Sequence, residues 1–195
     1  PNVRGFNFRQ ETRMTCFVLV PIGRYEIIVA AQPIASEVYV IRHRLQTVLS
    51  AEGRTLVSIL YLGTGEAFDH TQPNVSFVLT SSSQRVLFDC GYSIPHQLWN
   101  ISTDPNYIHS IYLSHFHADH CFGLPAVIAR LGQDGRTAPL AIIGGPGSQQ
   151  AATAVLELGY PGILKKIGFP LRFLEIAPGA PKTYGGWMFS TALSL

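Results

Sequence analysis

The stretch from residue 108 to residue 120, IHSIYLSHFHADH, joins a short apolar run to a dense group of histidines and one carboxylate. The apolar run, residues 108–113, predicts a buried β-strand. Four potential metal ligands follow it within six residues: His115, His117, Asp119 and His120. Side chains alternate along an extended chain, so we expect the first three on one side of the strand end, with a turn into a helix bringing the fourth beside them. Imidazole and carboxylate groups suit Zn²⁺, Mn²⁺ or iron at a hydrolytic site, and this spacing can serve two ions.

Strands and helices are predicted in alternation on both sides of this stretch, with turn residues between them. The strands are expected at residues 56–62, 75–80, 85–90, 140–143, 171–176 and 187–191. Helices are expected at residues 126–131 and 148–158. Three serines join the second and third strands, which predicts a hairpin. This mixture indicates a layered α/β sandwich.

The first 54 residues fit this pattern less well. We treat them as an N-terminal extension of uncertain structure, before a domain at residues 55–195. Residues 17–20 and 25–30 predict a hairpin, and residues 36–50 a helix. The extension has a net charge of +3, whereas residues 55–195 have a net charge of −1. Because RNA-binding domains usually present a basic surface, this balance does not favour an RNA substrate.

Composition excludes several classes of protein. Of the 195 residues, 47% are apolar and 13% charged, which excludes a disordered chain and a coiled coil. The longest apolar stretch, residues 15–31, contains Pro21, Arg24 and Glu26, so no membrane span is predicted. Three widely spaced cysteines do not make a disulfide framework, and no signal peptide is predicted. We therefore expect a cytoplasmic protein.

Residues 115–120 resemble the HxHxDH signature of the metallo-β-lactamase superfamily. Three further motifs match that superfamily in order: residues 62–65 (LGTG), residues 87–91 (LFDCG) and the Gly-Gly-Pro turn that ends residues 140–146. The resemblance covers residues 55–195. Within the superfamily, this sequence is similar in particular to the ribonuclease Z-like phosphodiesterase branch. It implies an α/β (α+β) fold, the four-layered αβ/βα sandwich of that superfamily.

The resemblance also implies roles for individual residues. His115 and His117 would hold one zinc ion, and Asp119 and His120 a second, with Mn or Fe as alternatives. A hydroxide shared by the two ions would be the nucleophile, and Asp119 would orient or deprotonate the attacking water. Asp89 matches an aspartate whose implied work is to hydrogen-bond the ligand imidazoles or the loop backbone.

Two departures from the family pattern bear on the function. Ribonuclease Z has Glu-Gly-Thr after the Asp-Cys-Gly motif, whereas residues 92–97 here are YSIPHQ, which weakens a tRNA-processing assignment. The family completes its metal shell with later histidines and an aspartate, but no histidine follows His120, and Asp134 is expected in a surface turn. We therefore expect a domain truncated after its first half, in which metal binding is weak.

These observations lead to three hypotheses. The first is a zinc-dependent hydrolase, a ribonuclease Z-like phosphodiesterase that cleaves a small phosphodiester with metal-activated water. The second is a hydrolase of lactones or other esters with the same fold, and the third is a catalytically silent fragment. A homodimer is compatible with all three. Of the remaining reactive side chains, His96 is expected at the surface, and Cys90 and Cys121 are expected to be buried and not nucleophilic.

Overall fold

The computed structural model describes residues 14–22, 25–30, 46–48, 57–81 and 84–193, and side chains within residues 57–81 and 84–191. The strands are β1 (Met14–Ile22), β2 (Tyr25–Ala30), β3 (Gln46–Val48), β4 (Val57–Gly63), β5 (Ser76–Ser81), β6 (Gln84–Phe88), β7 (Ser110–Leu113), β8 (Leu140–Gly144), β9 (Leu171–Glu175), β10 (Lys182–Tyr184) and β11 (Trp187–Leu193). The helices are α1 (Ile94–Ile101), α2 (Ala118–Cys121), α3 (Leu124–Gln133), α4 (Ser148–Gly159) and the 3₁₀ turn η1 (Ile163–Lys165).

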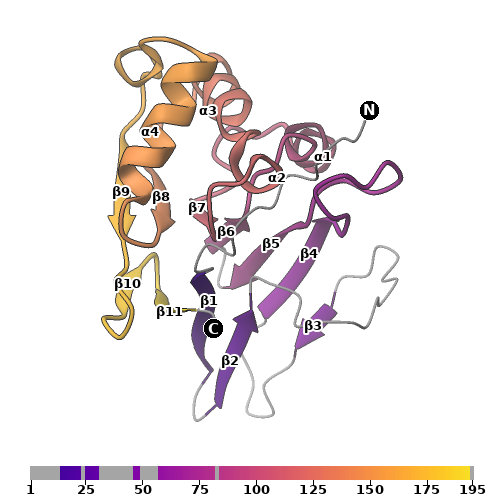
Figure 1. Ribbon diagram of the computed structural model, residues 1–195, viewed down its shortest axis with the longest axis vertical. Coiled ribbons are helices and arrows are strands. Elements are labelled where there is room, and N and C mark those ends of the chain that lie inside the picture. The colour runs from indigo at the N-terminus through magenta and orange to yellow at the C-terminus, as the bar shows by residue number, and fades with distance from the viewer. Residues whose placement is uncertain (1–13, 23–24, 31–45, 49–56, 82–83, 194–195) are drawn as a thin grey trace, which may run out of the picture.

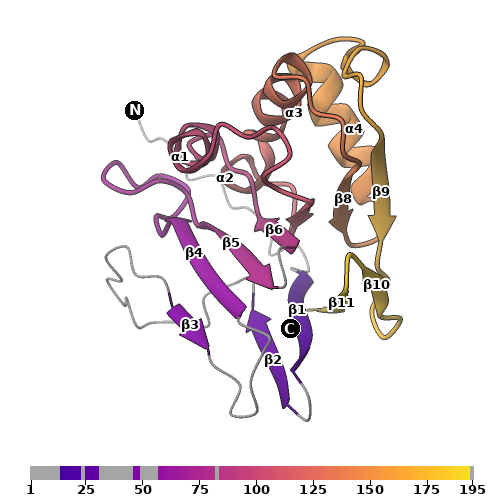
Figure 2. The same ribbon diagram turned by 180° about the vertical axis from the view of Figure 1, so that it is seen from behind.

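A seven-stranded sheet in the order β3-β4-β5-β6-β7-β8-β9 forms the centre of the molecule. Strands β3 to β6 pair antiparallel, and β6 to β9 pair parallel. Helical connections join the parallel strands, and β8, β9 and α4 lie side by side in both views (Figures 1 and 2). The carboxyl ends of β6, β7 and β8 therefore meet at one edge of the sheet.

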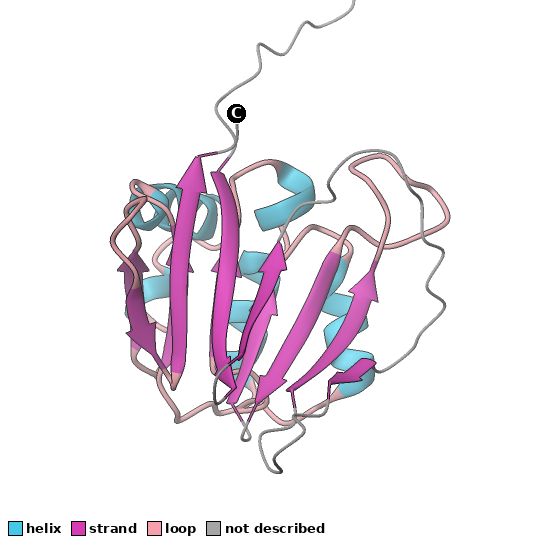
Figure 3. Cartoon of the chain, turned by 90° about the horizontal axis from the view of Figure 1, so that it is seen from below, coloured by secondary structure: helices cyan, strands magenta, loops and turns pink. Residues whose placement is uncertain are grey.

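Both faces of this sheet are buried, because its strands alternate apolar residues between the two faces. In β7, for example, Ile111 and Leu113 join the core beneath the helices, whereas Tyr112 joins the core on the opposite face. In β6, Leu87 faces the helices, and its neighbours Val86 and Phe88 face away from them. The helices accordingly cover one side of the strands (Figure 3).

A second sheet, in the order β10-β11-β1-β2, lies on the other face. Its β11 supplies Trp187 and Phe189 to the second core, where the Phe189 ring stacks on Tyr112 with 6.2 Å between the ring centroids. The described residues thus form three layers, namely helices, a mixed sheet and a second sheet. These layers agree with the predicted α/β sandwich.

The N-terminal hairpin is confirmed, since β1 and β2 pair antiparallel. Strand β1 also pairs with β11, the last described strand of the domain predicted at residues 55–195. The hairpin and β11 therefore belong to the same sheet. The division of the chain at residue 54 stays a prediction. The prediction of a helix at residues 36–50 is wrong at residues 46–48. These residues form the strand β3, which pairs with β4. The remainder of that helix lies outside the described residues.

The other predicted strands and helices are present with small shifts at their ends. Sequence reasoning did not identify α1, η1 and the short strand β10. None of the described helices is long and apolar enough to cross a membrane.

Arg136 is a buried cation that fastens the turn before β8, and its replacement should destabilise the fold. Its side chain is 2% exposed and donates hydrogen bonds to the backbone oxygens of Pro105, Ala138 and Pro139. Burial lowers its pKa. We expect Arg136→Ala to lower the free energy of unfolding by about 2–4 kcal/mol, because three carbonyl groups lose a charged donor. Urea unfolding measures this loss, with the exposed Arg172→Ala as the matched control. Equal effects of the two substitutions would contradict the prediction.

Candidate functional site

The predicted ligand residues lie where β6 and β7 end. Strand β7 ends at Leu113, and the chain then runs through His115 and His117 into the short helix α2, which contains Asp119 and His120. The backbone amide of Cys90, just after β6, donates to the carbonyl oxygen of His120 at 2.7 Å. The end of β6 is thereby joined to α2.

Asp89 is the polar centre of this region. It is 3% exposed and has a φ of 56°, a left-handed conformation that aspartate tolerates better than most residues. Its Oδ1 accepts a hydrogen bond from the backbone amide of Ser114 at 2.7 Å, and its Oδ2 lies 2.7 Å from both the Ser114 hydroxyl and His120 Nδ1. Both carboxylate oxygens are therefore used to hold the loop between β7 and α2.

The three imidazoles of this loop gather into one histidine cluster, His115, His117 and His120. The ring centroids of His115 and His117 are 4.6 Å apart, and those of His115 and His120 are 4.0 Å apart. His120 is buried, His115 is half-buried and His117 is exposed, so the cluster reaches from the interior to solvent. The expected approach of His120 to the other histidines is confirmed. Asp119, expected in the extended part, instead lies in α2, with Oδ2 3.1 Å from His120 Nε2.

This donor set fits a divalent metal ion in part. Imidazole and carboxylate are preferred zinc ligands, and two donor atoms bound to one zinc ion lie roughly 3–3.5 Å apart, close to the separation of the Asp119 and His120 atoms. Asp89 holds Nδ1 of His120, which leaves its Nε2 facing Asp119. Among the residues that the structure describes, however, no three His, Cys, Asp or Glu side chains converge as a metal centre. The described contacts therefore place one pair of potential donor atoms together, on Asp119 and His120.

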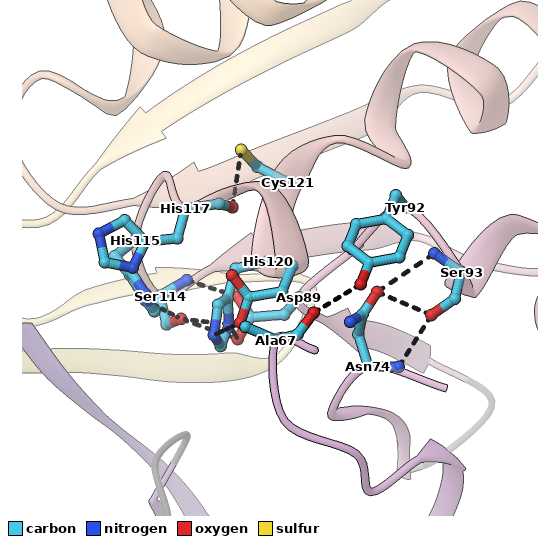
Figure 4. Close-up of polar contacts among 11 residues, drawn as sticks. Ala67, Asn74, Asp89, Tyr92, Ser93, Ser114, His115, His117, His120 and Cys121 are labelled. Carbon is cyan, nitrogen blue, oxygen red and sulfur yellow. Dashed lines mark hydrogen bonds and ion pairs between the residues drawn. The ribbon is translucent and has the colours of Figure 1, made fainter. Parts of the chain in front are cut away.

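A tight backbone contact sets the position of α2. A Cβ atom added at Gly91 would lie 2.0 Å from the carbonyl oxygen of Asp119, so only glycine fits there. It would also lie 2.7 Å from the Asn74 Oδ1 atom. Asn74 and Ser93 exchange hydrogen bonds, with Asn74 N to Ser93 Oγ at 2.8 Å and Ser93 Oγ to Asn74 Oδ1 at 2.7 Å. These hydrogen bonds fix the loop after β4 beside the candidate site. The Tyr92 hydroxyl adds a further contact, because it donates to the carbonyl oxygen of Ala67 in the same loop (Figure 4).

Other side chains considered from the sequence lie away from the cluster. His96 is exposed on α1, as expected, and lies 3.2 Å from Asn100. His109 precedes β7 at the opposite edge of the sheet, where burial and Arg85 lower its pKa. Asp134 pairs with Arg130 at the exposed end of α3, which agrees with the predicted surface turn.

Cys90 and Cys121 should not react with thiol reagents while the chain is folded. Both are buried, and burial raises the pKa of both thiols, that of Cys121 to about 12. Because only the thiolate is nucleophilic, we expect a Cys16→Ser variant to consume almost no Ellman's reagent near neutral pH, and two equivalents after unfolding in guanidinium. Rapid modification of the native variant would contradict the burial of these thiols.

Positive charge is absent from the described loops that form the candidate site. Seven Lys and Arg residues lie within the described residues, and none belongs to the loops after β4, β6 and β7 or to α2. Arg85 and Arg172 lie near the starts of β6 and β9, and Arg130 lies in the last turn of α3. These three cations are at the edge of the sheet opposite the histidine cluster.

Comparisons with known proteins agree with this architecture. A family model described as anti-Pycsar protein Apyc1 matches residues 57–145. The ribonuclease Z of Methanosarcina mazei is 33% identical over 125 residues, which are 64% of this chain and 40% of that protein. The ribonuclease Z of Prochlorococcus marinus strain MIT 9301 is 32% identical over 123 residues, 62% of this chain and 38% of the relative. The chain thus spans about 40% of the length of these curated relatives.

The crystal structure of the short form of human tRNase Z superposes with a TM-score of 0.52 at 28% identity, covering 63% of this chain and 46% of that one. The chain has the metallo-β-lactamase fold. A second solved structure, the metallo-β-lactamase fold protein YhfI of Bacillus subtilis, matches this fold with a TM-score of 0.50 at 20% identity, over 69% of this chain and 51% of that one. The predicted resemblance to the superfamily and to its ribonuclease Z-like branch is thereby confirmed.

Ser114 is the residue of this metallo-β-lactamase-fold site that sequence reasoning missed. The residue is 4% exposed, and its hydroxyl lies within hydrogen-bond distance of Asp89 Oδ2 and His115 Nδ1. A serine between a strand and a histidine looks like an ordinary turn residue. Its one distinguishing signal is its place between the last residue of β7 and His115, the first of the candidate ligands.

Proposed function

We propose that this chain carries part of the active site of a metal-dependent phosphodiesterase of the ribonuclease Z-like type. The observation that supports this proposal is a chain of contacts at the ends of β6 and β7: His115 lies beside His117 and His120, Asp119 lies beside His120, and the buried Asp89 holds His120. The likeness to ribonucleases Z over 62–64% of the chain supports the same class of reaction.

His115 and His117 would hold one divalent ion, and Asp119 and His120 a second, with zinc as the expected metal. When bound, such ions supply Lewis-acid polarisation of the scissile group and a water molecule of lowered pKa. The Asp119 carboxylate, half-buried and beside His120, would orient the attacking water and accept its proton. Asp89 would keep His120 in the orientation that presents Nε2.

We favour a small phosphodiester over an RNA as the substrate. An RNA substrate extends over many phosphates, and proteins that bind it offset those charges with lysine and arginine. The described loops around the histidine cluster carry none of these residues, and the described basic side chains of β6, β9 and α3 lie at the other edge of the sheet. A small diester carries a single charge and requires no such surface.

A silent chain is the second candidate, and the number of donors is the observation that favours it. Two side chains for each ion are fewer than the three protein ligands of catalytic zinc sites. No group of three converges in the described part of the chain. Ester hydrolysis stays a further alternative, since the same ions would polarise a carbonyl group.

Metal content and hydrolysis of three substrates test these proposals together. The full 195-residue chain is incubated with zinc, freed of excess metal, and analysed for bound zinc. Turnover is then measured on bis-p-nitrophenyl phosphate, a simple lactone and a tRNA precursor. Bound zinc with turnover of the small diester supports our proposal. Lactone turnover alone would replace it with ester hydrolysis, tRNA cleavage would contradict the substrate preference, and absence of both zinc and turnover would establish the silent chain.

A further inference from the structure

We infer that Ser114 is a positioning residue that sets which nitrogen of His115 carries the proton. The inference rests on hydrogen-bond geometry and extends the proposed function to a residue outside the ligand set. Ser114 Oγ lies 2.7 Å from Asp89 Oδ2 and 3.0 Å from His115 Nδ1. Ser114 and Asp89 are 4% and 3% exposed, so bulk water does not compete for these contacts.

The donors and acceptors can be assigned by counting protons. The Ser114 hydroxyl donates its single proton to Asp89 Oδ2. The hydroxyl oxygen can then only accept from His115, which requires the proton of that imidazole to be on Nδ1. The lone pair of His115 is consequently on Nε2, the state in which an imidazole ligates a metal ion through that atom.

The same carboxylate orients a second imidazole without an intermediary. His120 Nδ1 lies 2.7 Å from Asp89 Oδ2 and 3.4 Å from Ser114 Oγ, so its proton is directed to the carboxylate. Asp89 therefore acts on His120 directly and on His115 through Ser114. In the proposed assignment these two histidines belong to different metal ions. The Asp89 carboxylate therefore orients one proposed ligand of each ion, and it reaches His115 through Ser114.

The tautomer of His115 in the metal-free chain provides a test that does not depend on metal binding. Two-bond ¹H–¹⁵N NMR spectra distinguish Nδ1–H from Nε2–H when recorded about two pH units above the ordinary imidazole pKa of about 6.5. We expect Nδ1–H in the wild-type chain and in Ser114→Thr, which keeps the hydroxyl. We expect Ser114→Ala to shift His115 toward Nε2–H, because the acceptor for the Nδ1 proton is gone.

Ser76→Ala is the matched control. Ser76 is 1% exposed, and its hydroxyl also contacts Asp89, but it donates to the backbone oxygen at 2.9 Å and not to the carboxylate. Both alanine variants lose one buried hydroxyl hydrogen bond to the same residue, so both should lower the melting temperature. Only Ser114→Ala should change the His115 tautomer. An equal change in Ser76→Ala would reduce Ser114 to a structural role and overturn the inference.

Zinc titration provides the second measurement. We expect Ser114→Ala to weaken one of two zinc-binding steps by about 10–100-fold and to leave the other unchanged, with recovery in Ser114→Thr. A wild-type chain with the expected tautomer but no zinc binding would contradict the proposed function and leave the assignment of Ser114 intact. An Nε2–H tautomer of His115 in the folded wild-type chain would overturn the inference. This result needs only the wild-type chain, so it decides the question even if Ser114→Ala does not fold.

Discussion

Asp89→Ala should lower the free energy of unfolding by about 3–5 kcal/mol, a large part of the 5–15 kcal/mol that stabilises a typical domain. The substitution leaves three donors without their acceptor in the interior: the Ser114 amide, the Ser114 hydroxyl and Nδ1 of His120. Hydrogen bonds to a charged group contribute about 1.5–3 kcal/mol each, and their losses overlap because they share one loop. Alanine is also strained at a φ of 56°.

Asp89→Asn separates these contributions. Asparagine has the same shape and tolerates a positive φ, so it removes the charge without adding backbone strain. We expect it to destabilise the chain less than alanine does and to weaken both zinc-binding steps. Urea unfolding measures the first effect, and zinc titration the second. If Asp89→Ala costs less than about 1 kcal/mol, in the range of a surface substitution, Asp89 does not hold the loop between β7 and α2.

The central strands could be predicted from the sequence because their apolar runs are buried on both faces and end at clear turn residues. The run at residues 108–113 becomes β7, and the run at residues 140–143 becomes β8 with one added residue. The candidate ligands were identified for a different reason, since four imidazole or carboxylate groups within six residues at a strand end are typical of a metal site. Their role as ligands stays a prediction. Asp89 was identified only through the resemblance.

The other features depend on contacts between distant parts of the chain. The pairing of β1 with β11 joins Met14 to Leu193, and no local pattern encodes which strand a hairpin will join. Helix α1 was missed, although Ile94 and Leu98 have helical spacing and Pro95 lies in its first turn. The structural role of Arg136 was equally hidden, because its three acceptors are backbone oxygens, which no sequence pattern displays.

Replacing His115 and His117 together by alanine should remove one equivalent of bound zinc and lower phosphodiester hydrolysis by at least about 10³-fold. Metal assistance contributes several kcal/mol to such reactions, and each 1.36 kcal/mol corresponds to a tenfold change in rate. The two rings lie 4.6 Å apart by their centroids, and in the proposed assignment they hold one ion. His117 is exposed and His115 half-buried, and we therefore expect little change in the free energy of unfolding.

The matched control is His96→Ala, which removes an exposed imidazole from α1 that has no part in the histidine cluster. Elemental analysis of the three proteins decides the assignment: the wild-type chain and His96→Ala should bind equal amounts of zinc, and the double variant one equivalent less. Circular dichroism shows whether the double variant keeps its fold. Equal zinc content in a folded double variant would contradict the assignment of His115 and His117 as ligands, because a bound ion would then be held by other side chains.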